Sequence, residues 1–214
     1  MEFIDETLAK YTESHSSPEP ALLAKLNRDT YANVLAPRML SGHIQGRVLS
    51  MLSKMIQPKA VLEIGTYTGY AALCLAEGLA PDGVLHTIDI NEELETRINT
   101  FVAQSPYANQ IKLHIGNALD IIPQLNKAFN LVFIDADKSN YSAYYDLLID
   151  TLPSGAIIIA DNVLWSGKIL DQAEIAKDAD TRALDEFNKK ITQDDRVENV
   201  LMPVRDGLMV IRKK

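Results

Sequence analysis

Two carboxylates, an amide and a lysine stand close to the ends of two apolar runs. Asp135 follows the run 131–134, and Lys138 comes three residues later. Asp161 and Asn162 follow a second run of this kind. Carboxylates held close together repel each other unless a cation lies between them. Oxygen-only ligands favour Mg²⁺, Mn²⁺ or Ca²⁺ over zinc, which prefers Cys and His. The cluster therefore indicates a divalent-cation site, the alternative being solvated loop acids that cap neighbouring helices.

Lys138 is close enough in sequence to Asp135 to share that site. The positive charge of a neighbouring cation and removal from water both favour the neutral amine of a lysine, which is then a base near neutral pH. A solvated surface lysine is the alternative. We predict that Lys138 is a general base.

A glycine-containing loop follows the earlier apolar run 61–64. Gly65 and Gly69 allow the backbone to approach a ligand, and a helix beginning near Tyr70 presents unpaired N–H groups to it. The spacing is Gly-x-x-x-Gly, which differs from the Gly-x-Gly-x-x-Gly of pyrophosphate-binding dinucleotide folds. Asp89 lies 24 positions after Gly65, at the end of the next run. A carboxylate there can accept hydrogen bonds from both hydroxyls of a ribose. Together these features favour an adenosine-containing cofactor over a plain strand-to-helix turn.

Short apolar runs alternate with amphipathic stretches of helical length. This alternation predicts β-α-β units, hence an α/β fold with a parallel sheet covered on both faces. The carboxyl ends of parallel strands face one edge of the sheet, so the residues that follow them converge on one crevice. The expected strands are 61–64, 84–88, 111–115, 131–134 and 156–160, and the expected helices between them are 70–79, 92–104, 119–125 and 141–152.

The two ends of the chain depart from the alternation. Three helical stretches precede the first strand, and we expect them to cap the sheet, cover the active site or form a dimer contact. They are 3–13, 19–34 and 43–56. At the other end the runs 197–202 and 208–211 flank a turn too short for a parallel crossover, so one strand must be reversed. The stretch 163–179 has little pattern and is expected to be a loop over the active edge.

The length of 214 residues predicts one domain. The expected elements divide it into a helical cap (1–57) and a sheet core (58–214). The 21 basic and 29 acidic residues give a net charge of −8, which argues against a nucleic-acid partner. No apolar run can cross a bilayer, and the first residues lack the layout of a signal peptide, so we expect a cytoplasmic protein without a membrane partner. The lone Cys74 lies in an apolar run and is expected to be buried.

Four segments, taken in order and spacing, resemble the cation-dependent O-methyltransferases, which include catechol and caffeoyl-CoA O-methyltransferases and their bacterial relatives. The segments are 61–70, 133–141, 161–167 and 206–208. The resemblance runs from about Arg38 to the C-terminus. It implies the Rossmann-like fold of S-adenosylmethionine (SAM)-dependent methyltransferases, with extra N-terminal helices and a seven-stranded, mostly parallel sheet that contains one antiparallel strand.

The resemblance also implies roles for individual residues. Asp135, Asp161 and Asn162 would bind the metal, Mg²⁺ first with Mn²⁺ or Ca²⁺ as alternatives, and Lys138 would be the catalytic base beside Asp135. The cofactor site would comprise Ser41, Glu63, Gly65, Thr66, Ala71, Asp89, Ala118, Asp135 and Asp137.

Two positions depart from the pattern of the family. Ala71 stands where relatives commonly carry a serine that bonds the methionine carboxylate. Pro203 stands where the animal catechol enzyme has a glutamate that reaches the other hydroxyl of the substrate. Catechol itself is therefore not implied as the substrate.

The predicted activity is transfer of a methyl group from SAM to a hydroxyl of a small vicinal-dihydroxy aromatic, with divalent-cation dependence. The resemblance also implies a homodimer. A nicotinamide-dependent oxidoreductase is one alternative, and the glycine spacing and the final hairpin count against it. A non-catalytic cofactor-binding protein on the same fold is the other, and the presence of the metal-ligand set together with Lys138 counts against it.

Overall fold

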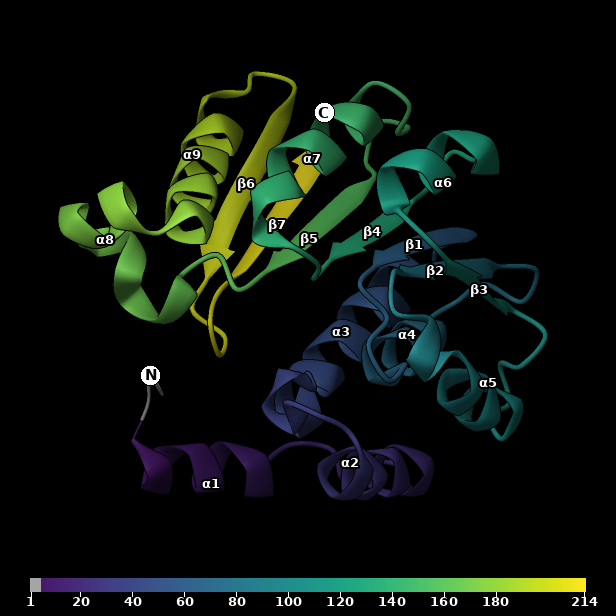
Figure 1. Ribbon diagram of the computed structural model, residues 1–214. Coiled ribbons are helices and arrows are strands. Elements are labelled where there is room, and N and C mark those ends of the chain that lie inside the picture. Colours follow the sequence, from purple (N-terminus) through teal and green to yellow (C-terminus); the bar gives the residue numbers. More distant parts are fainter. Residues whose placement is uncertain (1–4) are drawn as a thin grey trace.

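A seven-stranded sheet forms the centre of the molecule, with strand order β3-β2-β1-β4-β5-β7-β6 (Figure 1). The structure is a computed structural model and describes residues 5–214. β7 runs antiparallel to both of its neighbours, and the other pairs are parallel, which confirms the predicted reversal. The strands are β1 (Ala60–Ile64), β2 (Val84–Asp89), β3 (Ile111–Ile115), β4 (Leu131–Ile134), β5 (Ile157–Asp161), β6 (Val197–Met202) and β7 (Leu208–Lys213).

Both faces of the central strands are buried, which explains why their sequences are mostly apolar. Successive side chains of a strand point to opposite faces. Leu62 of β1 and Val132 of β4 accordingly pack in one apolar cluster, while Val61 and Phe133 pack in the other. The sheet is thus the middle layer between two hydrophobic cores.

Helices cover both faces of the sheet (Figure 1). Buried side chains of α6, α7 and α9 belong to one core, and those of α2, α3, α4 and α5 belong to the other. The helices are α1 (Glu6–Ser14), α2 (Ala21–Asn33), α3 (Gly42–Ile56), α4 (Tyr70–Ala76), α5 (Glu95–Ala103), α6 (Ala118–Leu125), α7 (Tyr141–Ile149), α8 (Gln172–Lys177) and α9 (Ala179–Gln193). Short 3₁₀ helices occur at η1 (Pro37–Met39), η2 (Glu92–Leu94), η3 (Lys138–Asn140) and η4 (Trp165–Leu170).

The stretch 163–179 is not the loop that the sequence pattern predicted. It contains η4 and α8, and it leads directly into α9, for which no helix was predicted. Asp171 caps α8 by accepting the Ala173 N–H at 2.8 Å, and Asp178 caps α9 by accepting the Thr181 N–H at 3.3 Å. Caps of this kind satisfy N–H groups that a helix leaves unpaired at its start.

The N-terminal helices lie at one end of the molecule, with α1 and α2 below the sheet in Figure 1. The predicted helix 3–13 includes residues outside the described part of the chain, and α1 begins at Glu6. No side chain of α1 is buried. His43 of α3 contacts the end of α1 and the residues that follow it. Its ring nitrogens lie 2.7 Å from the Ser17 carbonyl and 3.1 Å from the Glu13 carboxylate.

α3 packs unusually close to α4. A Cβ atom at Gly46 would lie 2.7 Å from Tyr70 Cε1 and 2.8 Å from Cys74 Sγ, so only glycine permits this approach. Cys74 is fully buried, as predicted. Arg47 of α3 forms an ion pair of 2.7 Å with Glu77, which follows α4. α3 is thereby fixed against the sheet layer. Within residues 5–214, no helix is long and apolar enough to span a membrane.

Candidate active site

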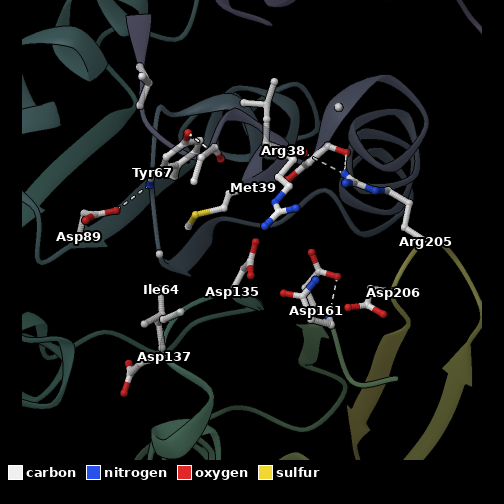
Figure 2. Close-up of a pocket in the computed structure, with 18 of the residues that line it drawn as sticks. Arg38, Met39, Ile64, Tyr67, Asp89, Asp135, Asp137, Asp161, Arg205 and Asp206 are labelled. Carbon is white, nitrogen blue, oxygen red and sulfur yellow. Dashed lines mark hydrogen bonds between the residues drawn. The ribbon is translucent and has the colours of Figure 1, made fainter. Parts of the chain in front are cut away.

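Asp135, Asp161 and Asn162 come together at the carboxyl ends of β4 and β5. The two strands are parallel neighbours, and Ile134 lies opposite Ala160, so the residues that follow them emerge side by side. Figure 2 shows the carboxylates of Asp135 and Asp161 extending into the same part of a cleft. The sequence predicts this convergence because the carboxyl ends of parallel strands face one edge of the sheet.

Lys138 lies in the same cluster. Its side chain is buried, and its Nζ donates hydrogen bonds to Asp135 Oδ1 at 3.1 Å, Asn162 Oδ1 at 2.7 Å and Tyr141 Oη at 2.7 Å. A positive group thus bridges oxygens of two of the predicted metal ligands. The Lys138 Nζ also lies 5.9 Å from the centre of the Trp165 ring.

Asp161 is the most buried acid of the cluster, with 3% of its surface exposed. Burial, followed by the charge of Asp135, raises its pKa to about 7. The Asn162 N–H donates to Oδ1 at 2.7 Å, and Gln45 Nε2 donates to Oδ2. Asn162 itself adopts a left-handed backbone with φ of 59°, a conformation that asparagine tolerates better than most residues.

The donor set suits a hard divalent cation. A cation would relieve the repulsion between Asp135 and Asp161 that raises the pKa of Asp161. The third ligand would be an amide oxygen, as Mg²⁺ and Ca²⁺ accept. In the described part of the chain, no three His, Cys, Asp or Glu side chains gather to hold a metal, so this set depends on Asn162.

The glycine loop packs directly against the end of β4. Gly65 has φ of 97°, and a Cβ atom there would lie 1.9 Å from the Asp135 carbonyl oxygen, so no other residue fits. Asp89, the last residue of β2, accepts the Tyr67 N–H at 2.6 Å and the Asn91 N–H at 2.8 Å (Figure 2). These bonds fix the Asp89 carboxylate at the edge of the cleft.

The cleft has a volume of about 2040 Å³. Most of the residues predicted for the site line it. They are Ser41, Gly65, Asp89, Ala118, Asp135, Asp137, Lys138, Asp161 and Asn162. Asp137 is held in place by the Tyr144 hydroxyl, which donates to its Oδ1 at 2.5 Å.

Three of the residues predicted for cofactor binding lie behind the wall of the cleft. Glu63 is fully buried and accepts a hydrogen bond from the Thr87 hydroxyl, which is also bonded to the Thr66 hydroxyl. Burial raises the pKa of Glu63 well above its usual value, and its Oε1 has no hydrogen-bond partner among residues 5–214. Ala71 is buried in α4. Glu63, Thr66 and Ala71 thus lie behind the lining of the cleft, and their contacts with the cofactor stay a prediction.

The segment 35–41, in which the sequence predicted a role for Ser41, forms the opposite wall. Tyr67 Oη donates to the Leu35 carbonyl at 2.9 Å, and Arg205 Nη1 donates to the Leu40 carbonyl at 2.9 Å and to the Ser41 carbonyl. Between these anchors, the side chains at positions 38 and 39 extend into the cleft (Figure 2).

Another anchor holds the segment after β5. Asp206, in the β6–β7 turn, accepts the Ser166 N–H at 2.5 Å. Burial raises the pKa of Asp206. The turn thus holds both the segment 35–41 and the segment after β5, which border the cluster of Asp135 and Asp161. The family motif 206–208 lies in and after this turn.

A family model described as O-methyltransferase matches residues 13–214. The chain belongs to this O-methyltransferase family. Among curated relatives, a caffeoyl-CoA O-methyltransferase of Mesembryanthemum crystallinum is 35% identical over 206 residues, which cover 92% of this chain and 80% of the relative.

Solved structures agree with the assignment. A methyltransferase of Podospora anserina bound to S-adenosylhomocysteine aligns with a TM-score of 0.90 and 27% identity, covering 100% of this chain and 98% of that one. An O-methyltransferase of Streptomyces achromogenes, involved in tomaymycin synthesis and solved with SAM, aligns with a TM-score of 0.87 and 26% identity over 97% and 96% of the two chains. The predicted methyltransferase fold and the predicted O-methyltransferase family are both confirmed.

Proposed function

We propose that this O-methyltransferase transfers a methyl group from SAM to one hydroxyl of a small vicinal-dihydroxy aromatic, with the help of a divalent cation. One observation carries the proposal. Two carboxylates, an amide oxygen and a buried lysine meet in a cleft whose other end is formed by the glycine loop and Asp89.

SAM fits the end of the cleft near Asp89. The Asp89 carboxylate would accept hydrogen bonds from the ribose hydroxyls, and Gly65 would allow the backbone to lie against the cofactor. Ser41, Ala118 and Asp137 line the same cleft and complete the proposed cofactor site. The solved relatives that hold SAM or S-adenosylhomocysteine support this cofactor.

Asp135, Asp161 and Asn162 would hold the cation, Mg²⁺ in the first place with Mn²⁺ or Ca²⁺ as substitutes. When bound, the cation supplies positive charge that favours the ionised hydroxyl of the acceptor, and SAM supplies the methyl group. The fit rests on the oxygen-only donor set and on the raised pKa of Asp161, which is caused first by burial and then by the charge of Asp135.

Lys138 would take up the proton of the acceptor hydroxyl at Nζ. A free phenol has a pKa of about 10 and is a weak nucleophile at neutral pH, so removal of its proton is a necessary step. To act as the base, Lys138 must be the neutral amine, with two N–H groups and one lone pair. Asp135, Asn162 and Tyr141 all lie within hydrogen-bonding distance of Nζ and hold it in place. Holding the acceptor oxygen in line with the methyl carbon and sulfur contributes further, up to ~7–11 kcal/mol in favourable cases.

The walls of the cleft suit an aromatic acceptor. Met39 and Trp165 line it, and the indole ring lies near the Lys138 ammonium. Pro203 also lines the cleft and offers no carboxylate to a second hydroxyl. In this proposal the cation and apolar contact hold the acceptor, without a carboxylate at position 203.

The test is a turnover assay with a panel of catechol, caffeoyl and flavonoid acceptors, run with Mg²⁺ and with excess chelator. We expect methylation of at least one vicinal diphenol that chelator abolishes. Asp161→Ala is expected to lose transfer while SAM affinity, measured by titration calorimetry, stays unchanged, because Asp161 binds the metal only. Full activity in that variant, or in chelator, would refute cation dependence.

We also propose a homodimer. Large apolar side chains are exposed on the N-terminal helices, with 59% exposure at Tyr11, 57% at Met51 and 74% at Met55. Their burial between two copies would be favourable. Light scattering during size-exclusion chromatography is expected to give twice the mass of one chain, and the mass of one chain would reject the dimer.

A further inference from the structure

Gln45 contacts the candidate metal cluster from α3, which supplies none of the predicted metal ligands. It is 1% exposed and donates from Nε2 to Asp161 Oδ2 across 116 positions of sequence. Gln45 is not among the residues that line the cleft. Its amide therefore contacts Asp161 from behind the lining of the cleft.

Gln45 completes a set of bonds that leaves the Asp161 carboxylate one orientation. The Asn162 N–H holds Oδ1 at 2.7 Å, and Gln45 holds Oδ2. The backbone of Asp161 is fixed as well, because Tyr141 Oη donates to its carbonyl at 3.0 Å. An ionised carboxylate has about four acceptor positions, so each oxygen keeps capacity for a further partner. That remaining capacity can be directed at a cation.

The chemistry of an amide suits this role. An ionised carboxylate only accepts hydrogen bonds, so the amide must present its NH₂ group to Asp161. The amide carries no charge, so unlike a lysine or arginine it does not repel a cation held by the same carboxylate.

The position of Gln45 is fixed by the packing of α3. The neighbouring Gly46 lies against the rings and sulfur of α4 at a distance only glycine permits, and Leu49, one turn later, is fully buried. The amide is thus presented by a rigid helix.

We infer that Gln45 is a positioning residue for the metal site, orienting Asp161 for cation binding. The inference rests on the proposed function, in which Asp161 is a metal ligand. Removing a hydrogen-bond partner of a metal ligand typically costs about 10–100-fold in metal affinity. Because Gln45 touches neither SAM nor the acceptor, the loss is expected in cation affinity and not in SAM affinity.

The experiment compares Mn²⁺ binding to wild type and Gln45→Met, by titration calorimetry and by Mn²⁺ electron paramagnetic resonance, in the presence of SAM. Methionine keeps the size of the side chain and removes the donor. We expect a dissociation constant for Mn²⁺ about 10–100-fold higher, with the SAM constant unchanged. Activity at saturating Mn²⁺ is expected to recover toward wild type.

Ser53→Ala is the matched control. Ser53 is also a fully buried polar residue of α3, and it donates to the Leu75 carbonyl at 2.6 Å, away from the cleft. Its loss is expected to leave Mn²⁺ affinity unchanged. If Gln45→Met fails to fold by circular dichroism, Gln45→Asn replaces it, since the shorter side chain keeps the amide but withdraws it from Asp161.

The outcomes separate the inference from the proposed function. Wild-type affinity for Mn²⁺ in the Gln45 variant would overturn the inference alone, and so would an equal loss in Ser53→Ala. Absence of Mn²⁺ binding to wild type would instead overturn the proposed metal site.

Discussion

Lys138 is the residue on which the proposed proton transfer depends. Lys138→Ala is expected to lower kcat by roughly 10²–10⁴-fold, the usual contribution of a general base. The check is steady-state kinetics with a vicinal diphenol at saturating SAM and Mg²⁺. Lys168→Ala removes an exposed lysine of η4 and serves as the control, with kcat expected unchanged. A near-normal kcat in Lys138→Ala would assign the proton to another acceptor.

Asp135, Asp161 and Asn162 could be predicted from the sequence because each follows a strand of a parallel sheet, and such strands end at one edge. Gln45 and Arg205 could not be predicted in this way. Gln45 meets Asp161 across 116 positions and Arg205 meets Ser41 across 164, through helix packing and turn geometry that no local pattern records.

The same limit explains the placement of Glu63. The resemblance implied a contact of Glu63 with the cofactor, and that contact stays a prediction. In the structure Glu63 accepts from the Thr87 hydroxyl, which is also bonded to the Thr66 hydroxyl. Alternation of side chains along a strand decides between the two faces, and the apolar neighbours on both sides of Glu63 conceal that choice.

At the scale of elements, the contact between the glycine loop and β4 gives a sharp test. Gly65→Ala would place a Cβ atom 1.9 Å from the Asp135 carbonyl. We expect unfolding free energy to fall by about 3 kcal/mol or more, together with weaker SAM binding. Chemical denaturation and calorimetry measure the two effects.

Gly167→Ala is the matched control for that substitution. Gly167 also has positive φ, 81°, but a Cβ atom there meets nothing within 4 Å. Only the backbone cost of roughly 1 kcal/mol is expected. Equal losses in the two variants would show that the close approach to Asp135 contributes nothing.

The contact between α3 and the end of α4 makes stability depend on pH. Burial alone would raise the pKa of Glu77, but hydrogen bonds from Arg47, Lys54 and Ser50 outweigh it and lower the pKa to about 2. The unfolded chain therefore binds the proton first, so this contribution is complete above about pH 4.5 and is lost as pH falls toward 2.

Denaturation of wild type and Glu77→Gln across pH measures that contribution. The difference in unfolding free energy is expected to reach up to about 3 kcal/mol near pH 6 and to shrink steadily below pH 4.5. A difference that stays constant with pH would show that the Glu77 charge is not stabilised by the fold.

The strands were predictable to within one or two residues because most of them are short segments dominated by apolar residues. The segment after β5 was not. Trp165, Ser166 and Gly167 all have positive φ, so η4 has no regular period to read. α9 did carry a usable signal, since its buried Leu184, Phe187 and Ile191 repeat at helical spacing.

At the scale of the whole molecule, the cleft draws on elements from both halves of the sheet and from the N-terminal segment. SAM is therefore expected to stabilise the folded state as a unit, by about 2.7 kcal/mol at a concentration of 100 Kd. Thermal unfolding with and without SAM measures the shift. Asp89→Ala is expected to reduce the shift, and Asp120→Asn, at an exposed acid of α6, is expected to keep it.

No change in melting temperature with SAM, at concentrations where calorimetry shows binding, would contradict a site that joins these elements. A full shift in Asp89→Ala would remove the proposed ribose contact while leaving the cofactor itself in place.

The hydrogen bonds that Tyr67 and Arg205 make with the wall segment 35–41 all go to its main chain, while the Leu40 side chain packs in the core. Tyr67 and Arg205 donate hydrogen bonds to the carbonyl oxygens of Leu35, Leu40 and Ser41, and no side chain of the segment takes part in these bonds. Mutation at positions 38 and 39 thus leaves the fastening intact. Natural or designed substitutions of Arg38 and Met39 can therefore change the surface that faces the cleft without displacing the backbone that carries it.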